Sequence, residues 1–476
     1  MTFFQYLRIR VAARATRQAI LSRHLERLVV TAAIIAAVCV AVTSCRGGDD
    51  GAEAAMPQAR NDASASTGSS TGSVVFIHPD GTGATTWAAL RLLEVGPDGY
   101  TNWDKMDRTG LYRGHLKNSL ASSSHGGATV HAYGVKASFG NYGTSERLPV
   151  TSRSGKDYSI MIEALKAGFA VGTINSGQIA EPGTGVFLAS SHARSATDPI
   201  TKQIIESGAD IIMAGGEERL LPAGVTGRHG KKGVRKDGLN LIDTAEKLGY
   251  TVVYTRDELL ALPDNTDKVL GVYSAGHTFN QASEEKLKKE GLPLFKNSVP
   301  SVAEMTEVAL RILTHKGKQF LLVVEEEGTD NFANRGNATG TFECARRADA
   351  AIGVAMRYID EHPSTLLLTA ADSNAGGMSI LAVGDREDFD SPLPATVRAG
   401  APLDGRGGTQ TPPFLAAPDQ FGHRMAFGVV WAGTNDFGGG IIAKAHGLNA
   451  DRLPNNVDNT VIYKMMYYTL FGRWLD

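Results

Sequence analysis

Cysteine is scarce in this chain of 476 residues, which contains only Cys39, Cys45 and Cys344. The first two lie close to the N-terminus, so most of the chain contains a single cysteine and we expect no intrachain disulfide there. Internal repeats are also missing, which argues against repeat architectures. The composition, 42% hydrophobic and 21% charged, is that of a globular protein with one large core or two smaller ones.

The N-terminal segment lacks an apolar run long enough for a membrane-spanning helix, because Leu28 to Val42 falls short of the about 20 residues needed. Six arginines precede this run, and it ends in Val42-Thr43-Ser44-Cys45, which resembles the cleavage site of bacterial lipoproteins. We predict a lipoprotein-type signal peptide over residues 1–44 and attachment to a bacterial membrane through lipidated Cys45. The protein would then be exported to the periplasm or the cell surface. An uncleaved membrane anchor is the alternative.

Large apolar residues are nearly absent between Arg46 and about Gly72, where Gly, Ala, Ser, Asp and Thr predominate. Such a composition cannot bury enough surface to fold, so residues 45–72 are predicted to be a disordered tether. Without the six arginines and one glutamate of the signal peptide, the chain has 42 basic and 49 acidic residues. This mildly acidic balance argues against a nucleic-acid partner.

From residue 73 onward, short apolar runs alternate with helical patterns. The runs lie at 74–78, 169–174, 210–215, 251–255, 269–274, 320–325, 365–370 and 425–431, and the helical patterns at 158–167, 199–207, 240–248, 301–315 and 342–360. Strands that are apolar throughout and alternate with helices predict an α/β fold, doubly wound, with a largely parallel central sheet and helices on both faces. In such folds, ligands gather at the carboxyl ends of the strands. A stretch rich in Pro, Gly and Asp at about 385–424 is predicted to be an insertion.

Acidic residues follow several of these apolar runs. Asp80 follows the run at 74–78, Glu325 to Glu327 end the run at 320–325 and precede Asp330, and Asp372 follows the run at 365–370. A single carboxylate at the end of a strand is usually a helix cap or a turn residue. Several carboxylates along one edge of a sheet indicate a cation site.

A second cluster of polar residues lies at Ser122-Ser123-Ser124-His125 and is followed by a helical stretch. A serine at the start of a helix is most often only a cap, but the backbone amides and the helix dipole there also stabilise a nearby anion.

These segments resemble the alkaline phosphatase family. Asp80-Gly81-Thr82-Gly83 is similar to the family's Asp-Gly-x-Gly motif, and residues 124–136, SHGGATVHAYGVK, match its nucleophile segment. The stretches GADIIMAGG, DGLNLIDTAEKLGYTVVYTRDELLAL, PSVAEMTEVAL and FLLVVE follow in the family's order. The resemblance runs from about Val74 to the last helix, and it implies an alkaline phosphatase-like catalytic domain over residues 73–476.

The resemblance implies a metal-dependent phosphomonoesterase that hydrolyses small phosphoester substrates through a phosphoserine intermediate. It places the nucleophile on Ser124. The family's phosphate-binding arginine follows a ligand of the magnesium site by thirteen residues, and Arg194 follows Glu181 by thirteen. Asp80, Glu181 and Glu325, joined by Thr184, would then form the magnesium site. A homodimer is a further implication, because dimers are common in the family.

The sequence lacks the three zinc-binding histidines of the family. Asn334 and Ser373 stand where two of them would be, and the nearest counterpart of the third is the segment 431–436. The carboxylates Asp330 and Asp372 are retained. Oxygen ligands favour hard cations, whereas zinc favours nitrogen and sulfur. We therefore predict Mg²⁺, with Ca²⁺ or Mn²⁺ as alternatives, on the following ligands: Asp80, Glu181, Glu325, Asp330, Asn334, Asp372 and Ser373.

Zinc would be retained only if other histidines were recruited. His78, His125 and His192 lie near the predicted centre in sequence, and His423 would reach it only if the insertion folded over it. A histidine beside an active residue is more often a hydrogen-bond partner than a ligand.

A further departure is Ser123, which stands where the family carries an aspartate that positions the arginine. We conjecture that one of Glu325 to Glu327 holds Arg194 instead. Two other functions stay open at this point. One is a phosphodiesterase on the same fold, and the other is a non-catalytic lipoprotein that binds phosphate.

Overall fold

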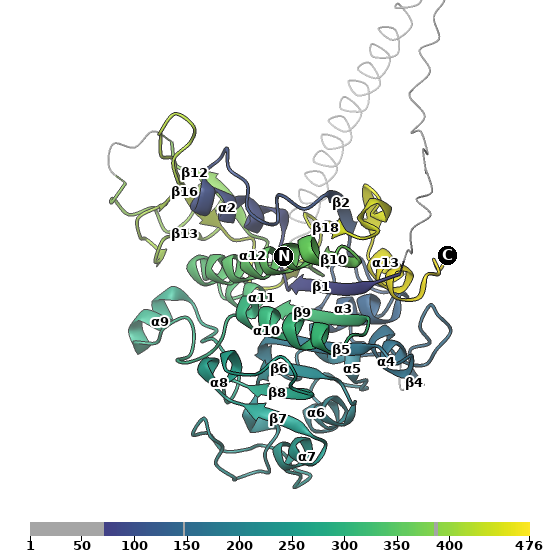
Figure 1. The fold of residues 1–476 in the computed structure, drawn as a ribbon. Coiled ribbons are helices and arrows are strands. Elements are labelled where there is room, and N and C mark those ends of the chain that lie inside the picture. The colour runs from purple at the N-terminus through teal and green to yellow at the C-terminus, as the bar shows by residue number, and fades with distance from the viewer. Residues whose placement is uncertain (1–70, 146–147, 385–388) are drawn as a thin grey trace, which may run out of the picture. The chain divides into compact units, whose positions relative to one another are not determined.

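The computed structural model describes residues 71–145, 148–384 and 389–476. The predicted signal peptide and nearly all of the predicted tether lie outside these residues. Within them, no helix is long and apolar enough to span a membrane. A ten-stranded sheet forms the centre of this part of the chain (Figure 1). Its strands, in order across the sheet, are β19 (Asn456–Asp458), β2 (Arg108–Arg113), β18 (Ile442–Gly447), β10 (Thr365–Thr369), β1 (Ser73–Pro79), β9 (Phe320–Glu326), β5 (Ala170–Gln178), β6 (Ile211–Gly215), β8 (Lys268–Val272) and β7 (Tyr250–Val253).

The sheet is mostly parallel, as predicted. Strands β10, β1, β9, β5, β6, β8 and β7 all pair in parallel. Strand β18 pairs antiparallel with both β10 and β2, and β19 then pairs in parallel with β2. The parallel strands are buried on both faces, which explains why their sequences are apolar throughout. The antiparallel strands β2 and β18 were not predicted, because their sequences carry polar residues.

Helices cover both faces of the sheet, and alternate residues of β1 show this. Val74 and Phe76 belong to one hydrophobic core, and Val75 and Ile77 to the other. The first core is closed by α3 (Ser124–Tyr133), α4 (Ile160–Lys166), α5 (Pro182–Leu188), α6 (Thr197–Glu206), α7 (Leu241–Lys247) and α13 (Thr460–Phe471). The second core is closed by α2 (Ala84–Val95), α8 (Arg256–Leu260), α10 (Val302–His315) and α12 (Ala338–Glu361). The predicted doubly wound α/β fold is therefore confirmed.

One predicted strand lies elsewhere. The run at 425–431 forms β16 (Ala426–Val430), which belongs to a separate five-stranded sheet and not to the central one. Its other strands are β12 (Ser379–Ala382), β13 (Leu403–Gly405), β14 (Gly408–Thr409) and β15 (Phe414–Leu415). Strands β13, β14 and β15 come from the predicted insertion, of which residues 389–424 are described. An apolar run does not by itself reveal which of two sheets it joins.

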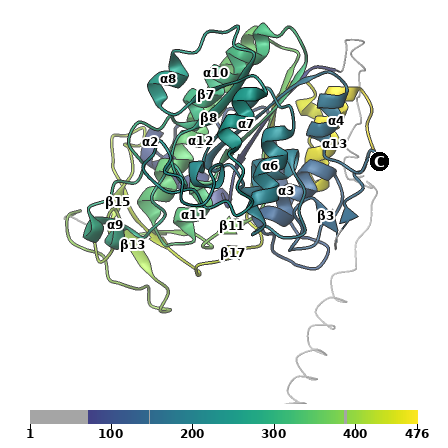
Figure 2. The same cartoon turned by 90° about the horizontal axis from the view of Figure 1, so that it is seen from below.

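Two short strand pairs and two short α-helices also lie around the sheets. Strands β3 (Thr144–Ser145) and β4 (Leu148–Pro149) pair antiparallel, as do β11 (Asn374–Ala375) and β17 (Asp436–Phe437). Helices α9 (Glu284–Glu290) and α11 (Gly328–Ala333) both contribute to a small core around Cys344. Figure 2 shows β11 and β17 close to α11.

Candidate functional site

The parallel strands bring the predicted carboxylates to one edge of the central sheet. Strands β10 and β9 flank β1 on either side, and the register pairs His78 of β1 with Glu325 of β9. Asp80 follows β1 directly, and Asp372 follows β10 after two residues. All four side chains are at most 1% exposed. The sequence therefore predicted this convergence correctly, because carboxyl ends of neighbouring parallel strands meet at the same edge.

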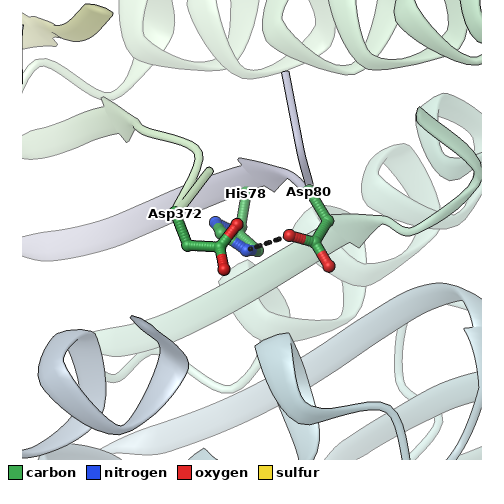
Figure 3. A group of neighbouring side chains, drawn as sticks. All are labelled: His78, Asp80 and Asp372. Atoms are coloured by element: carbon green, nitrogen blue, oxygen red, sulfur yellow. Dashed lines mark ion pairs between the residues drawn. The ribbon is translucent and has the colours of Figure 1, made fainter. Parts of the chain in front are cut away.

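The first group at this edge consists of His78, Asp80 and Asp372 (Figure 3). Each residue offers one potential ligand atom, and these three atoms all lie within 4.8 Å of one another. His78 Nε2 is 3.4 Å from Asp80 Oδ1, and its Nδ1 is 2.7 Å from the carbonyl oxygen of Ala370. Neither oxygen of Asp80 or Asp372 has a hydrogen-bond partner within the normal geometric limits. Buried polar atoms without partners are rare in proteins and indicate a site for a ligand or an ion.

The second group consists of Asp80, Glu325 and Glu327, whose carboxylate oxygens also lie within 4.8 Å of one another. Asn175 donates from Nδ2 to one oxygen of Glu325 and, at 2.8 Å, to Thr184 Oγ1. Thr184 Oγ1 in turn donates to the same oxygen of Glu325 at 3.4 Å. The other oxygen of Glu325 and one oxygen of Glu327 are buried without a partner. Three carboxylates in contact form a typical site for a hard divalent cation.

The third group lies between α11 and the strand pair β11 and β17. Asn334 Nδ2 donates to Asp330 Oδ1 at 2.9 Å and to Asp436 Oδ1 at 3.0 Å. Asn334 Oδ1 accepts from the backbone N–H of Gly376 at 3.2 Å. In this orientation the side-chain nitrogen of Asn334 faces the carboxylates and donates to them. The carboxylates of Asp330 and Asp436 are therefore the ligands available to a cation. Asp436 reaches the group because β17 pairs with β11, which begins two residues after Asp372.

The predicted nucleophile Ser124 is the first residue of α3 and is 6% exposed. Ser123 caps this helix: its Oγ accepts from the backbone N–H of Gly126 at 3.2 Å and donates to the carbonyl oxygen of Phe139 at 2.6 Å. The hydroxyl of Ser124 is therefore not required for the cap. Ser124 lies near Asp80, and this proximity helps to keep the pKa of Asp80 low. The N-terminus of α3 thus presents Ser124 to the acidic groups.

Arg194 lies beside the acidic groups, and its partner differs from our conjecture. Its guanidinium donates to Glu181 Oε2 at 2.8 Å, so Glu181 and not Glu325 to Glu327 holds it. The side chain of Arg194 is 45% exposed, whereas that of Glu181 is only 4% exposed. His277 Nε2 lies 3.7 Å from the other oxygen of Glu181. Glu181 therefore links the arginine to the acidic centre.

The electrostatics of the site favour bound cations. Burial, and after it the charge of Asp80, raises the pKa of Glu325 to about 8. Burial and neighbouring carboxylates also raise the pKa of Glu327 and of Asp372 well above their usual range. Burial acts on Asp80 as well, but the neighbouring side chains of His78 and Asp372 outweigh it and lower the pKa of Asp80. Because so many carboxylates share one buried space, either protons or cations must neutralise them.

The other histidines considered in the sequence differ in their surroundings. Burial, followed by the positive charge of Arg194, lowers the pKa of His125 to about 4, so this ring is neutral near pH 7. His192 is exposed. The side chain of His423 is 76% exposed and lies 3.6 Å from Asp419, a residue of the same loop. His423 therefore does not fold over the acidic centre.

Sequence reasoning missed three residues of the site. Glu327 was grouped with its neighbours but was not predicted as a ligand, because it lies just after β9 with helical backbone angles, where strand alternation no longer indicates its direction. Asp436 was confined only to a six-residue segment, because its position depends on the pairing of β11 with β17. His277 follows a strand in a loop and carried no spacing signal. Ser373 Oγ, in contrast, was predicted and is buried without a partner.

Fold and site together define the class of this protein: an α/β protein whose parallel sheet gathers buried carboxylates, a serine and an arginine at one edge. The model of the family described as alkaline phosphatase matches residues 72–391, and the chain belongs to the alkaline phosphatase family.

Individual relatives agree with this assignment. The chain is 28% identical over 338 residues to the tissue-nonspecific isozyme of alkaline phosphatase from Rattus norvegicus. That match covers 63% of either protein, so it spans less than two thirds of the relative's length. Alkaline phosphatase from Thermus thermophilus has a similar structure, with a TM-score of 0.64 at 21% identity, over 85% of this chain and 92% of that one. A variant of TAB5 alkaline phosphatase with Mg bound in its M3 site gives a TM-score of 0.63 at 17% identity, over 85% and 99%.

Proposed function

We propose that this protein is a metal-dependent phosphomonoesterase that uses Ser124 as its nucleophile. The observation that carries the proposal is the position of Ser124, at the N-terminus of α3 and near Asp80. Family membership supports a phosphatase, and a serine in this position combines a nucleophilic oxygen with the amides of a helix N-terminus. A helix-capping role alone does not explain Ser124, because Ser123 already provides the cap.

The residues of the three groups fit divalent cations. Asp80, Glu325 and Glu327 have unpartnered buried oxygens, as expected of ligands, and Glu181 and Thr184 lie beside them. Asp330 and Asp436 offer a second set of oxygens, and Ser373 is a further candidate. When bound, such cations would stabilise the negative charge of the reacting oxygens and lower the pKa of the Ser124 hydroxyl. We propose Mg²⁺ for the oxygen-only groups, with Ca²⁺ or Mn²⁺ as alternatives.

In the proposed reaction, Ser124 Oγ loses its proton to solvent and forms a bond to phosphorus while the bond from phosphorus to the leaving oxygen breaks. The leaving alcohol takes up a proton from solvent. Water then loses a proton to solvent and attacks the phosphoserine. The bond from Oγ to phosphorus breaks, Oγ takes up a proton from solvent, and inorganic phosphate is released. Arg194 binds two oxygens of the phosphoryl group with its planar pair of donors, and Glu181 holds the guanidinium in place.

Neutral His125, the second residue of α3, has an unpartnered Nδ1 and contributes a hydrogen bond to the phosphate and no charge. Export, attachment through Cys45 and the homodimer remain predictions from the sequence. They concern residues and contacts outside the described part of the chain.

The proposal is tested with Ser124→Ala and the control Ser122→Ala, each assayed on an aryl phosphate monoester and on the matching diester after chelation and reloading with Mg²⁺, Ca²⁺, Mn²⁺ or Zn²⁺. Ser122 is also buried, but its Oγ faces the backbone carbonyl of Ser123 at 3.3 Å. We expect Ser124→Ala to lose at least about 10³-fold in kcat on the monoester, as removal of a nucleophile does, and Ser122→Ala to stay within about fivefold.

Full activity of Ser124→Ala would refute the role of Ser124 as the nucleophile. A faster reaction of the wild-type protein on the diester would identify the phosphodiesterase alternative. Binding of inorganic phosphate without turnover, whichever of the four cations is present, would identify the non-catalytic one.

A further inference from the structure

The orientation of His78 carries an inference that goes beyond the loss of the family's histidines. The ring is fully buried, and its edge packs against Phe76 and against His131, whose ring centroid is 5.5 Å away. Nδ1 lies 2.7 Å from the carbonyl oxygen of Ala370, which can only accept. Nδ1 must therefore carry a proton, and in the neutral ring the lone pair is on Nε2. Hydrogen bonding of one ring nitrogen to a backbone carbonyl is the usual arrangement of a histidine that binds a metal through the other nitrogen.

The free nitrogen points into the group formed with Asp80 and Asp372. Figure 3 shows the imidazole between the two carboxylates, with the dashed line joining it to Asp80. The separation of 3.4 Å between Nε2 and Asp80 Oδ1 is longer than the about 2.7–2.9 Å of a charge-assisted hydrogen bond. Two ligand atoms about 2.0–2.1 Å from a tetrahedral zinc ion are about 3.3–3.4 Å apart. The observed spacing is that of two ligands of one ion.

The remaining atoms of the group also fit an ion better than a proton. A proton on Nε2 would satisfy one oxygen of Asp80 at most. The second oxygen of Asp80 and both oxygens of Asp372 would stay buried without partners. A single divalent cation neutralises both carboxylates and accepts the lone pair of His78 at the same time.

We propose that His78 supplies the nitrogen ligand of a zinc-type cation site shared with Asp80 and Asp372, so that the centre holds two chemically different sites. One nitrogen and two carboxylate oxygens suit Zn²⁺ and leave a fourth position open, as catalytic zinc sites do. The group of Asp330 and Asp436 has no nitrogen ligand and suits Mg²⁺ or Ca²⁺.

The family's histidine is replaced by Ser373, beside Asp372. His78, which lies on β1 two residues before Asp80, thereby supplies the missing nitrogen ligand. The inference rests on the proposed function in one respect: a cation held by His78, Asp80 and Asp372 would lie near Ser124, which is close to Asp80.

The experiment measures binding and not turnover. The full chain is purified, freed of metal by chelation and dialysed against Zn²⁺ buffered at graded free concentrations in the presence of excess Mg²⁺. Bound zinc is then determined by elemental analysis for the wild-type protein, for His78→Gln and for the control His131→Gln. His131 is equally buried, and its Nε2 is 2.7 Å from Tyr112 Oη, so it tests the effect of losing a buried imidazole that does not face the carboxylates.

We expect wild-type protein and His131→Gln to bind one zinc ion with similar affinity, and His78→Gln to bind it more than about 100-fold more weakly, since even loss of an outer hydrogen bond to a ligand costs 10–100-fold. Equal zinc affinity of His78→Gln and the wild-type protein would overturn the proposal. If His78→Gln does not fold, X-ray absorption of the wild-type protein with one equivalent of zinc decides. Outer-shell scattering from an imidazole ring supports the proposal, and a shell of oxygen ligands alone overturns it.

Failure of the proposed function would look different. An inactive protein whose zinc binding still depends on His78 would refute the phosphatase and keep the metal site. An active enzyme that depends on Ser124 but binds zinc without His78 would keep the phosphatase and refute the proposed metal site.

Discussion

Substitution of Gly183 by alanine should displace a metal-site carboxylate without removing any charged group. Gly183 lies in the first turn of α5, and a Cβ placed there would be 1.9 Å from Glu325 Oε1 and 2.3 Å from its Cδ. Carbon and oxygen atoms do not approach so closely, so Glu325 would have to move. It is buried at 0% exposure and held through its other oxygen by Asn175, so it has little room to do so.

The expected cost has two parts. Overpacking of a buried site destabilises the metal-free protein by about 1–3 kcal/mol. Displacement of Glu325 should also weaken Mg²⁺ binding by about 10–100-fold, which corresponds to about 1.4–2.7 kcal/mol less stabilisation by the metal. The two parts separate when urea unfolding is measured on chelated protein and again at graded Mg²⁺ concentrations.

Gly140→Ala serves as the matched control. Gly140 is exposed, and a Cβ there would meet no heavy atom within 4 Å. This variant should unfold and bind Mg²⁺ like the wild-type protein. If Gly183→Ala behaves in the same way, the position of Glu325 is not set by its contact with α5, and the reasoning fails.

Three further predictions concern protonation and phosphate binding. Burial raises the pKa of Glu284 to about 8, so the folded state keeps a proton that the unfolded state releases. The free energy of unfolding should therefore fall as the pH rises from about 4.5 to 8, by up to about 1.4 kcal/mol per pH unit. In urea unfolding at pH 5 and pH 8, Glu284→Gln should make the fall in stability smaller by the part due to Glu284, leaving the part due to the other buried carboxylates; an unchanged fall would contradict the assignment. Because the pKa of Glu325 is also raised to about 8, Mg²⁺ affinity should increase up to that pH and binding should release protons, which calorimetry in buffers of different ionisation enthalpy would detect. Arg194→Ala should raise the inhibition constant of inorganic phosphate by at least about tenfold, with Arg194→Lys in between, and equal inhibition of all three proteins would refute the phosphate contact.

The parts of the site that the apolar runs predicted lie at the carboxyl ends of strands. Asp80 and Glu325 converge because parallel strands end together, and this needs only the apolar runs to be recognised. Ser124 was placed by its resemblance to a family motif. Asp436 depends on β17 pairing with β11 across 61 residues that include the separate five-stranded sheet, and no local pattern encodes that register.

Long-range contacts also explain why the sequence did not reveal which sheet the run at 425–431 joins, or the tautomer of His78. The run at 425–431 is apolar like the central strands, and only its partners show that it joins the second sheet. The tautomer of His78 is set by the carbonyl of Ala370, which is 292 residues away in the chain. Contacts of this kind arise from the folded chain, so composition and spacing do not report them.

Cys344 is the only cysteine after residue 45 in the sequence, and it lies on α12 at 0% exposure. Burial raises the pKa of its thiol well above the usual value, and the negative charge of Glu326 adds to this effect. A protonated thiol that solvent does not reach reacts slowly with alkylating reagents. A cysteine introduced on the surface of the described domain would therefore be its only reactive thiol. Fluorophores, spin labels or a solid support could then be attached at one chosen position, such as the edge of the five-stranded sheet, without first removing a native cysteine.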